Sequence, residues 1–266
     1  MAIALSIQVK LTLSHLFKGN DMSAGSTAVS GKIEDLYVQY GCGMSAPEGW
    51  LNFDASPNLL LERLPVIGFF YAGQKYIGDS PVRMKFPQTI QFGDIVKGLP
   101  LEKGSVKGIY ASHVLEHLPL EDCRVALQNT FNLLEPGGIF RLLVPDLKIL
   151  ASRYINSSEP GASVSFIQAM EMGTIRKSRG VKGLVASFLS NKNHVWMWDY
   201  NSMKLELEKI GFTNIRRANF NDSEDPMFKN VEDERRFIEA VAIQCQKPVL
   251  ILELFILPRL RQQLPQ

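Results

Sequence analysis

The sequence predicts an α/β fold in which a mostly parallel sheet carries helices on both faces. From Ile33 onward, short apolar runs typical of buried strands alternate with stretches whose apolar residues repeat at helical spacing. Glycine, proline and polar clusters separate these segments. Such alternation is typical of parallel sheets built from strand–helix–strand units. With 266 residues, 45% of them apolar and 21% charged, the chain is long enough for one well-cored domain of this class.

Two segments flank the predicted domain. Residues 1–32 form an N-terminal extension with a linker rich in Gly and Ser, residues 33–248 form the domain, and residues 249–266 form a tail. No signal peptide is expected, because Lys10 interrupts the first apolar run and no cleavage site follows it. The apolar run of the tail is much shorter than the ~20 residues of a spanning helix. We expect the tail to pack on the domain or on a second subunit, with weak attachment to a membrane surface as the alternative.

The first half of the domain predicts strands separated by one clear helix. Asn58–Phe70 carries leucines at helical spacing and predicts that helix. Only six residues separate Gly43 from Trp50, whereas a parallel crossover through a helix takes about ten or more. The first crossover is therefore expected to be a loop or a single turn. The predicted strands of this half are Leu36–Tyr40, Leu51–Phe53, Val82–Phe86, Thr89–Phe92 and Val106–Ser112.

The middle of the domain predicts an amphipathic helix followed by a central strand. The helix is expected over Leu120–Leu134. Gly137 and Gly138 follow it, and a glycine after a helix supplies the left-handed cap that other residues resist. The β-branched and aliphatic run Ile139–Val144 then predicts the strand. The inward face of the helix is expected to consist of Val125, Leu127, Phe131 and Leu134.

The last part of the domain predicts two further helices and two further strands. The helices are expected at Asp146–Tyr154 and at Tyr200–Ile210, and the second should stop at Gly211. Between them, residues 156–193 show no regular period. The last two strands are expected at Phe212–Ala218 and Phe237–Ile243, joined by a long polar loop, Asn219–Asp233, whose segment 221–226 should be solvated.

Glycine and acidic residues gather where the predicted strands end. Gly41 and Gly43 follow the first strand, Asp54 follows the second, and Asp94 follows a later one. The carboxyl ends of parallel strands form the crevice in which open α/β sheets bind nucleotide-like ligands. Glycines allow backbone to approach a ligand closely, and a carboxylate can accept hydrogen bonds from both hydroxyls of a ribose. The pattern therefore predicts an adenosine-containing cofactor.

The composition opposes several other functions. The formal net charge of +2 and the lack of a Lys/Arg block oppose a nucleic-acid partner. Cys42, Cys123 and Cys245 are far apart, and the four histidines lack metal-ligand spacing, so no metal site is predicted. An odd, sparse cysteine count is typical of a reducing, cytoplasmic location.

Taken together in this order, the motifs resemble those of class I S-adenosylmethionine-dependent methyltransferases, in particular the type 11 group. The resemblance covers roughly Ile33 to Pro248. It implies a Rossmann-like, doubly wound sheet of seven strands with an antiparallel last strand, and S-adenosyl-L-methionine as cofactor. Residues 155–193 are expected to be a substrate-side insertion that shapes the acceptor pocket. A small molecule, a sugar and a lipid headgroup all remain open as the acceptor. The motifs are Tyr40-Gly41-Cys42-Gly43, Asn52-Phe53-Asp54-Ala55-Ser56-Pro57, Gly93-Asp94-Ile95, His113-Val114-Leu115-Glu116-His117-Leu118, Leu134-Glu135-Pro136-Gly137-Gly138 and Val144-Pro145-Asp146-Leu147.

The resemblance implies a role for each matching position. The segment Gly41-Cys42-Gly43 would pass beneath the methionine part of the cofactor. Asp54 would hold the ribose hydroxyls, and Asp94 with the backbone of Ile95 would meet the adenine edge. Ser112 and His113 would lie near the transferred methyl group. The aromatic ring of Tyr40 is a local candidate for stabilising the sulfonium cation.

Direct transfer from a sulfonium needs mainly proximity and alignment. A hydroxyl acceptor would also need a general base, for which His113 and His194 are the candidates. His194 begins an aromatic-rich segment, His194–Tyr200, which is as consistent with core packing as with substrate contact.

Structural roles remain open for several of these residues. The glycines could form only a turn, Asp54 could cap a short helix, and Asp94 could form a turn after Gly93. Glu116 and His117 could tie a helix to the core or take part in the chemistry, and His117 is expected mainly to do the first. Asp146 could equally belong to an active-site loop or cap the next helix.

Two departures from the family pattern motivate a rival function. Gln39 stands where an acidic residue is common, and Ser45 stands where a further glycine is common. A non-catalytic module that keeps the fold is therefore the first alternative. A nicotinamide-dependent oxidoreductase is a weaker one, because the short first crossover lacks the helix N-terminus that a pyrophosphate needs. A nucleic-acid methyltransferase would need a basic face and a base-pocket motif, which the sequence lacks.

Overall fold

The computed structural model describes residues 35–64, 74–77, 80–83, 85–173 and 193–249. The chain divides into two compact units, Met1–Glu34 and Asp35–Gln266. The first unit and the tail beyond Val249 lie outside the described residues, and so do the N-terminal extension and the tail contacts expected from the sequence. Everything below concerns the second unit.

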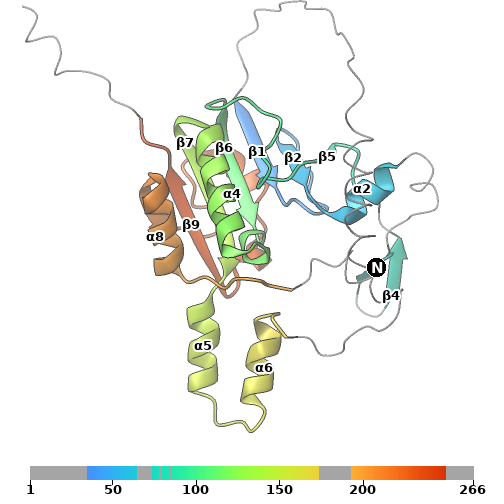
Figure 1. Cartoon of the computed structure of the whole chain (residues 1–266), viewed down its shortest axis with the longest axis vertical. Helices are drawn as coiled ribbons and strands as arrows, with labels where there is room; N and C mark the ends of the chain where they lie inside the picture. The colour runs from blue at the N-terminus through green and yellow to red at the C-terminus, as the bar shows by residue number, and fades with distance from the viewer. Residues whose placement is uncertain (1–34, 65–73, 78–79, 84, 174–192, 250–266) are drawn as a thin grey trace, which may run out of the picture. The chain divides into compact units, whose positions relative to one another are not determined.

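Seven of the described strands form one sheet in the order β5-β2-β1-β6-β7-β9-β8 (Figure 1). Strand β9 is antiparallel to both of its neighbours, and the other pairs are parallel. The predicted fold class, a Rossmann-like and mostly parallel seven-stranded sheet with an antiparallel last strand, is confirmed. The strands are β1 (Leu36–Tyr40), β2 (Leu51–Asp54), β5 (Ile90–Phe92), β6 (Val106–Ser112), β7 (Leu134–Pro145), β8 (Thr213–Arg217) and β9 (Ala240–Gln246).

One face of the sheet is covered by two helices, α4 (Leu120–Leu133) and α8 (Tyr200–Ile210), which lie side by side (Figure 1). Helix α8 stops at Gly211, as predicted, because this residue adopts a left-handed φ of 107°. Alternate residues of the strands point toward these helices and form the main core. The fully buried members of this core include Val38, Ile109, Phe140, Leu142, Leu127 and Leu207.

The opposite face is covered in a different way. In the described part of the chain, its main cover is η2 (Pro226–Asn230), a short 3₁₀ helix. Phe228 of this helix is fully buried in a second core with Tyr37, Trp50 and Tyr110. The loop that crosses this face is therefore part of the domain's hydrophobic packing.

The remaining described elements lie outside the main sheet. Strands β3 and β4 form a separate antiparallel hairpin. Helices α5 and α6 contact each other, and the rings of Tyr154 and Phe166 stack between them with centroids 5.0 Å apart. No helix within the described ranges combines the length and the apolar character that crossing a membrane requires. These elements are α2 (Pro57–Arg63), β3 (Gln74–Ile77), β4 (Ser80–Arg83), η1 (Leu115–His117), α5 (Leu147–Ile155), α6 (Ala162–Ala169) and η3 (Glu234–Phe237).

Several predicted strands and one predicted helix have different bounds in the structure. Residues 82 and 83 of the strand expected at Val82–Phe86 belong to the hairpin strand β4 instead of the main sheet. The strand expected at Phe237–Ile243 begins at Ala240, because the residues before it form η3. The helix expected over Asn58–Phe70 ends at Arg63 in α2, and the part from residue 65 on lies outside the described residues.

The end of α4 also differs from the prediction. Val125 does not point inward, since it is 43% exposed. The chain passes from Leu133 directly into β7, so Gly137 does not cap the helix. With a φ of 85°, Gly137 instead allows an irregularity near the start of β7, where the pairing with β6 shifts register.

The loop after β8, whose segment 221–226 was expected to be solvated, is exposed in part and is held in part by a buried arginine. Arg141 of β7 is fully buried and contacts the carboxylates of Asp222 (2.9 Å) and Glu232 (2.5 Å). It also donates hydrogen bonds to the Gln244 side chain (2.6 Å) and to the Asn219 carbonyl (3.0 Å). Since a buried charge must be paired, Asp222 and Glu232 neutralise Arg141, while Asn221 and Glu224 of the same loop are exposed as expected.

Candidate functional site

The glycine turn and the first carboxylate lie together at the edge where the parallel strands end. Strand β1 ends at Tyr40, and Gly41 and Gly43 follow it with φ of 63° and 59°. Strand β2 ends at Asp54, whose carboxylate accepts hydrogen bonds from the backbone N–H of Gly43 (2.8 Å) and of Ser56 (2.7 Å). Asp54 therefore ties the turn after β1 to the turn after β2.

The second carboxylate follows β5 at the same edge. Oδ1 of Asp94 accepts a hydrogen bond from the backbone N–H of Val96 (3.0 Å), which is the turn-forming role considered from the sequence. Its Oδ2 lies 3.0 Å from Nζ of the exposed Lys97. The Asp94 side chain is 24% exposed and so remains accessible from the crevice.

Asp54 and Asp94 line a single cavity of about 200 Å³. The two carboxylates thus share one crevice with the glycine turn. An adenosyl group carries two ribose hydroxyls and an exocyclic amine, and all of them donate hydrogen bonds that carboxylates can accept. Among the residues that the sequence associates with a cofactor, this cavity is lined by Tyr40, Gly41, Asp54, Asp94, Ile95 and His113.

Cys42, Gly43 and Ser112 are not part of this lining, and the Tyr40 side chain that contributes to it also packs in the core. Cys42 is buried in a small apolar cluster with Leu59 and Phe86. Gly43 reaches the site through its hydrogen bond to Asp54, and Ser112 ends β6 next to His113. The ring of Tyr40 belongs to the core, where its hydroxyl is hydrogen-bonded to Thr130 (3.2 Å) and its ring stacks on Phe140.

His113 begins the turn after β6 in a left-handed conformation, with a φ of 55° that is uncommon outside glycine. Its Nδ1 lies 3.3 Å from Oε1 of Glu116, and its Nε2 lies 3.0 Å from the carbonyl oxygen of Arg236. Burial lowers the pKa of His113, but the Glu116 carboxylate and the Arg236 carbonyl more than offset this effect, so the pKa lies above its usual value. The ring is held by contacts on both nitrogens.

A second cavity, of about 420 Å³, shares His113 and His117 with the first. Element η1, which holds Glu116 and His117, therefore lies between the two cavities. His194 lines the second cavity and is absent from the lining of the first. The other polar residues of the second lining include Glu171, Arg235, Arg236 and Glu239.

Two residues with open roles, His117 and Asp146, both make structural contacts. Nδ1 of His117 lies 3.2 Å from the carbonyl oxygen of Asn193, which is the structural tie expected from the sequence, but the residue also lines both cavities. Asp146 caps α5 by accepting a hydrogen bond from the backbone N–H of Lys148 (2.8 Å). Asp146 is therefore explained by helix capping.

Sequence reasoning left Glu116 open, as a side chain that ties a helix to the core or takes part in the chemistry, and it missed the contribution of Val114 and Leu118 to the first cavity. All three belong to the segment His113–Leu118, which the sequence singled out as a motif. The available signal was the polar pair Glu116-His117 inside an otherwise apolar stretch that follows a strand. Their meeting with His194 had no sequence signal, because it depends on how a distant segment returns to the sheet.

Three comparisons with known proteins complete the description. The model of a family described as a methyltransferase domain matches residues 47–217. A search of curated proteins finds no match. Similar solved structures include a complex of a Haloferax volcanii methyltransferase activator with a methyltransferase (14% identity, 80% of this chain, 83% of that chain, TM-score 0.39). They also include two SAM-dependent methyltransferases. The protein from Archaeoglobus fulgidus has 14% identity over 80% of this chain and 86% of that chain, with a TM-score of 0.41. The protein from Thermotoga maritima has 15% identity over 80% of this chain and 82% of that chain, with a TM-score of 0.41.

Proposed function

Because the chain belongs to the methyltransferase-domain family, we propose that it transfers a methyl group from S-adenosylmethionine, the cofactor of this class, to a small-molecule acceptor. The family match includes Asp54, Asp94 and His113 within residues 47–217. The observation that carries the proposal is the pair of adjoining cavities that share His113 and His117. One cavity offers the groups that an adenosyl ligand needs, and the other offers space for an acceptor.

The cofactor would occupy the smaller cavity, at the strand ends. Asp54 would accept hydrogen bonds from the ribose hydroxyls, and Asp94 would accept one from the adenine amine. The methionine part would run past Gly41 toward His113, since both residues line the same cavity. In this arrangement the sulfonium methyl group points to the junction with the second cavity.

Methyl transfer at this junction would be an in-line displacement. A lone pair of the acceptor attacks the methyl carbon, the carbon–sulfur bond breaks with its electron pair remaining on sulfur, and S-adenosylhomocysteine leaves. The sulfonium is already a strong electrophile, so the protein contributes mainly proximity and alignment. A hydroxyl acceptor would lose its proton to a base, for which His113 at the junction and His194 in the second cavity are the candidates.

The acceptor would occupy the second cavity, whose volume of about 420 Å³ is within the range of small-molecule sites. Its lining contains histidine, glutamate and arginine side chains together with the apolar Leu150 and Ile238. Such a lining suits a small polar molecule, a sugar or a lipid headgroup better than an extended hydrocarbon.

Isothermal titration with S-adenosylmethionine tests the cofactor site. The wild-type chain should bind one cofactor, and Asp54→Ala should bind it about tenfold to a hundredfold more weakly, because hydrogen bonds to a charged group are each worth about 1.5–3 kcal/mol. Glu102→Gln, which changes an exposed glutamate outside both cavity linings, is the matched control. Circular dichroism must show that the Asp54 variant folds, since this carboxylate also ties two turns together.

Absence of binding by the folded wild-type chain would reject the proposal. Binding of the cofactor without methyl transfer to any acceptor in a metabolite extract would instead favour the non-catalytic module, the alternative motivated by Gln39 and Ser45. Gln39 is buried in the structure with 5% exposure, and its Oε1 makes no hydrogen bond within the described residues.

A further inference from the structure

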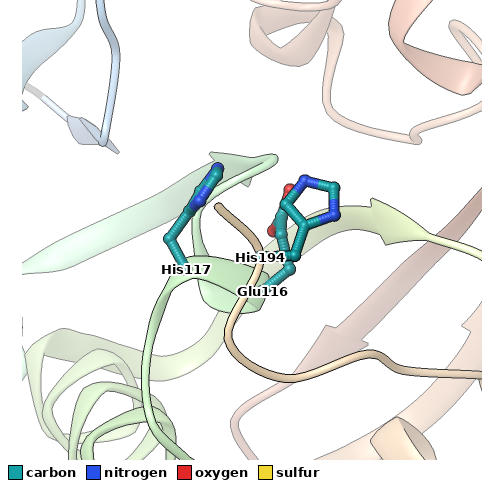
Figure 2. Close-up of side chains that lie close together, drawn as sticks. All are labelled: Glu116, His117 and His194. Carbon is teal, nitrogen blue, oxygen red and sulfur yellow. The ribbon is translucent and has the colours of Figure 1, made fainter. Parts of the chain in front are cut away.

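Glu116, His117 and His194 form a compact cluster of metal-ligating side chains at the wall of the second cavity. One ligand atom from each residue can be chosen so that all three lie within 4.8 Å of one another. Figure 2 shows Glu116 and His117 on adjacent positions of η1 and His194 on the segment that leads to α8, with the three side chains close together. The rings of His117 and His194 are 5.0 Å apart, centroid to centroid.

Each histidine has one nitrogen directed at a protein acceptor and one nitrogen that remains for a ligand. Nδ1 of His117 faces the carbonyl oxygen of Asn193 at 3.2 Å, which leaves Nε2. Nε2 of His194 faces the Glu171 carboxylate at 3.9 Å, and its Nδ1 is buried without a hydrogen-bond partner among the described residues. Histidines that bind metals commonly direct their second nitrogen at a carbonyl or carboxylate in this way.

The burial of Glu116 is a second, independent observation that favours a cation site at this cluster. Its side chain is fully buried, and neither carboxylate oxygen makes a hydrogen bond within the described part of the chain. Among the described residues, the His113 imidazole is its ion-pair partner, with Nδ1 lying 3.3 Å from Oε1 without hydrogen-bond geometry. A buried carboxylate is unfavourable unless it is paired or coordinates a metal, and a cation bound beside Glu116 would supply such a partner.

We propose that Glu116, His117 and His194 bind a divalent transition-metal ion, with Zn²⁺ as the best fit. Two imidazole nitrogens and one carboxylate are the ligand set of open zinc sites, which keep a fourth position for water or substrate. Imidazole ligands favour zinc and its first-row neighbours over Mg²⁺, which requires oxygen ligands in octahedral geometry. At metal–ligand distances of about 2.1 Å, tetrahedral ligand atoms lie roughly 3.4 Å apart, so the three side chains would draw together by about an ångström on binding.

The position of the cluster gives the ion a defined role. All three ligands line the second cavity, and His117 also lines the first. The open coordination position would therefore face the space beside the cofactor cavity. An oxygen-bearing molecule in the second cavity could bind there as the fourth ligand. With the metal bound, His194 would be a ligand, and His113 would be the remaining candidate base.

Titration of the metal-free chain with ZnCl₂ alone tests the site without requiring methyl transfer. After dialysis against a chelator and its removal, calorimetry should show one zinc ion bound per chain. Titration with CoCl₂ should produce the visible absorption of a four-coordinate cobalt ion, whereas MgCl₂ should give no comparable heat. Glu116→Gln, His117→Ala and His194→Ala should each weaken zinc binding by at least about tenfold, since even changes behind a ligand cost that much.

Two control variants and one stability measurement make the result decisive. His15→Ala, at a histidine outside the described residues, and Glu102→Gln, at an exposed glutamate, should bind zinc as the wild type does. Zinc should raise the thermal unfolding midpoint of the wild type but leave Glu116→Gln unchanged. The proposal is overturned if zinc does not bind at one ion per chain, or if all three ligand variants retain wild-type affinity. If Glu116→Gln lowers stability and zinc has no effect on either protein, Glu116 is neutralised by protonated His113 instead.

Discussion

At the scale of single residues, the two glycines after β1 have the same backbone conformation but different surroundings. Gly41 and Gly43 both lie in the left-handed region, with φ of 63° and 59°. A Cβ added to Gly41 would lie 2.3 Å from Cγ2 of Val114, whereas a Cβ added to Gly43 would meet nothing within 4 Å. Gly41 is therefore required both by backbone conformation and by space, and Gly43 by conformation alone.

We expect Gly41→Ala to lower the free energy of unfolding considerably more than Gly43→Ala. A left-handed non-glycine residue costs about 1–2 kcal/mol, and this cost applies to both variants. Overpacking against Val114 adds about 1–3 kcal/mol for Gly41→Ala only. Urea denaturation followed by circular dichroism measures both losses.

The double variant Gly41→Ala with Val114→Ala separates the two contributions. Removing the Val114 methyl groups should relieve the clash, so the double variant should lose less stability than the sum of the single changes. Equal losses for Gly41→Ala and Gly43→Ala would show that the contact with Val114 does not determine the requirement for glycine.

At the scale of secondary-structure elements, a buried ion cluster joins β7 to the loop between β8 and β9. Arg141 projects from β7 between apolar neighbours, and its guanidinium lies 5.7 Å from the centre of the Phe228 ring of η2. The side chain of its partner Glu232 is also fully buried, and Asp222 is 28% exposed. The pKa of Asp222 is lowered, because hydrogen bonds from Asn219, Arg141 and Arg216 outweigh the opposing effect of burial.

We expect Arg141→Met to reduce the free energy of unfolding by about 3–5 kcal/mol, because it leaves the Glu232 carboxylate buried without a counter-charge. The double variant Arg141→Met with Glu232→Gln should recover much of this loss, since no lone buried charge remains. Denaturant unfolding of the single and double variants measures the difference.

An exposed ion pair provides the matched control for this experiment. Arg235 pairs with Asp233 at 2.7 Å, but its side chain is 86% exposed. Arg235→Met should therefore cost less than about 1 kcal/mol. If Arg141→Met costs no more than Arg235→Met, the cluster does not hold the loop against the sheet.

At the scale of the whole molecule, the structural features that depend on neighbouring residues could be predicted from the sequence. The side-chain clusters that depend on contacts between distant segments could not. The sheet and the cavity with Gly41, Asp54 and Asp94 were predictable because each feature follows directly from a strand end. The convergence of Glu116, His117 and His194 could not be predicted, because it depends on contacts between distant segments. The backbone N–H groups of Val195 and Trp196 both donate to the Glu116 carbonyl, and these hydrogen bonds hold His194 beside η1.

The contacts between Arg141 and the loop that joins β8 to β9 were missed for a similar reason. Arg141 lies inside the apolar run Ile139–Val144, and no neighbouring residue in the sequence indicates which carboxylates pair with it. Asp222 belongs to the segment 221–226 that was expected to be solvated, and Glu232 belongs to the same long polar loop. Only the return of the chain across the sheet places them against the arginine.

Hydrogen exchange should show that cofactor binding acts on one half of the sheet. The proposed cofactor contacts the turns after β1, β2, β5 and β6, whose amides exchange by local opening at short labelling times. With S-adenosylhomocysteine present, we expect slower exchange in residues 41–43, 54–56, 93–96 and 112–114, and unchanged exchange at the exposed edge strand β8, which lies at the other end of the sheet. Mass spectrometry of peptic peptides measures the pattern, and Asp54→Ala should abolish it at the same ligand concentration. Protection confined to β8 and β9 would place the ligand elsewhere and contradict the assignment of the strand-end cavity.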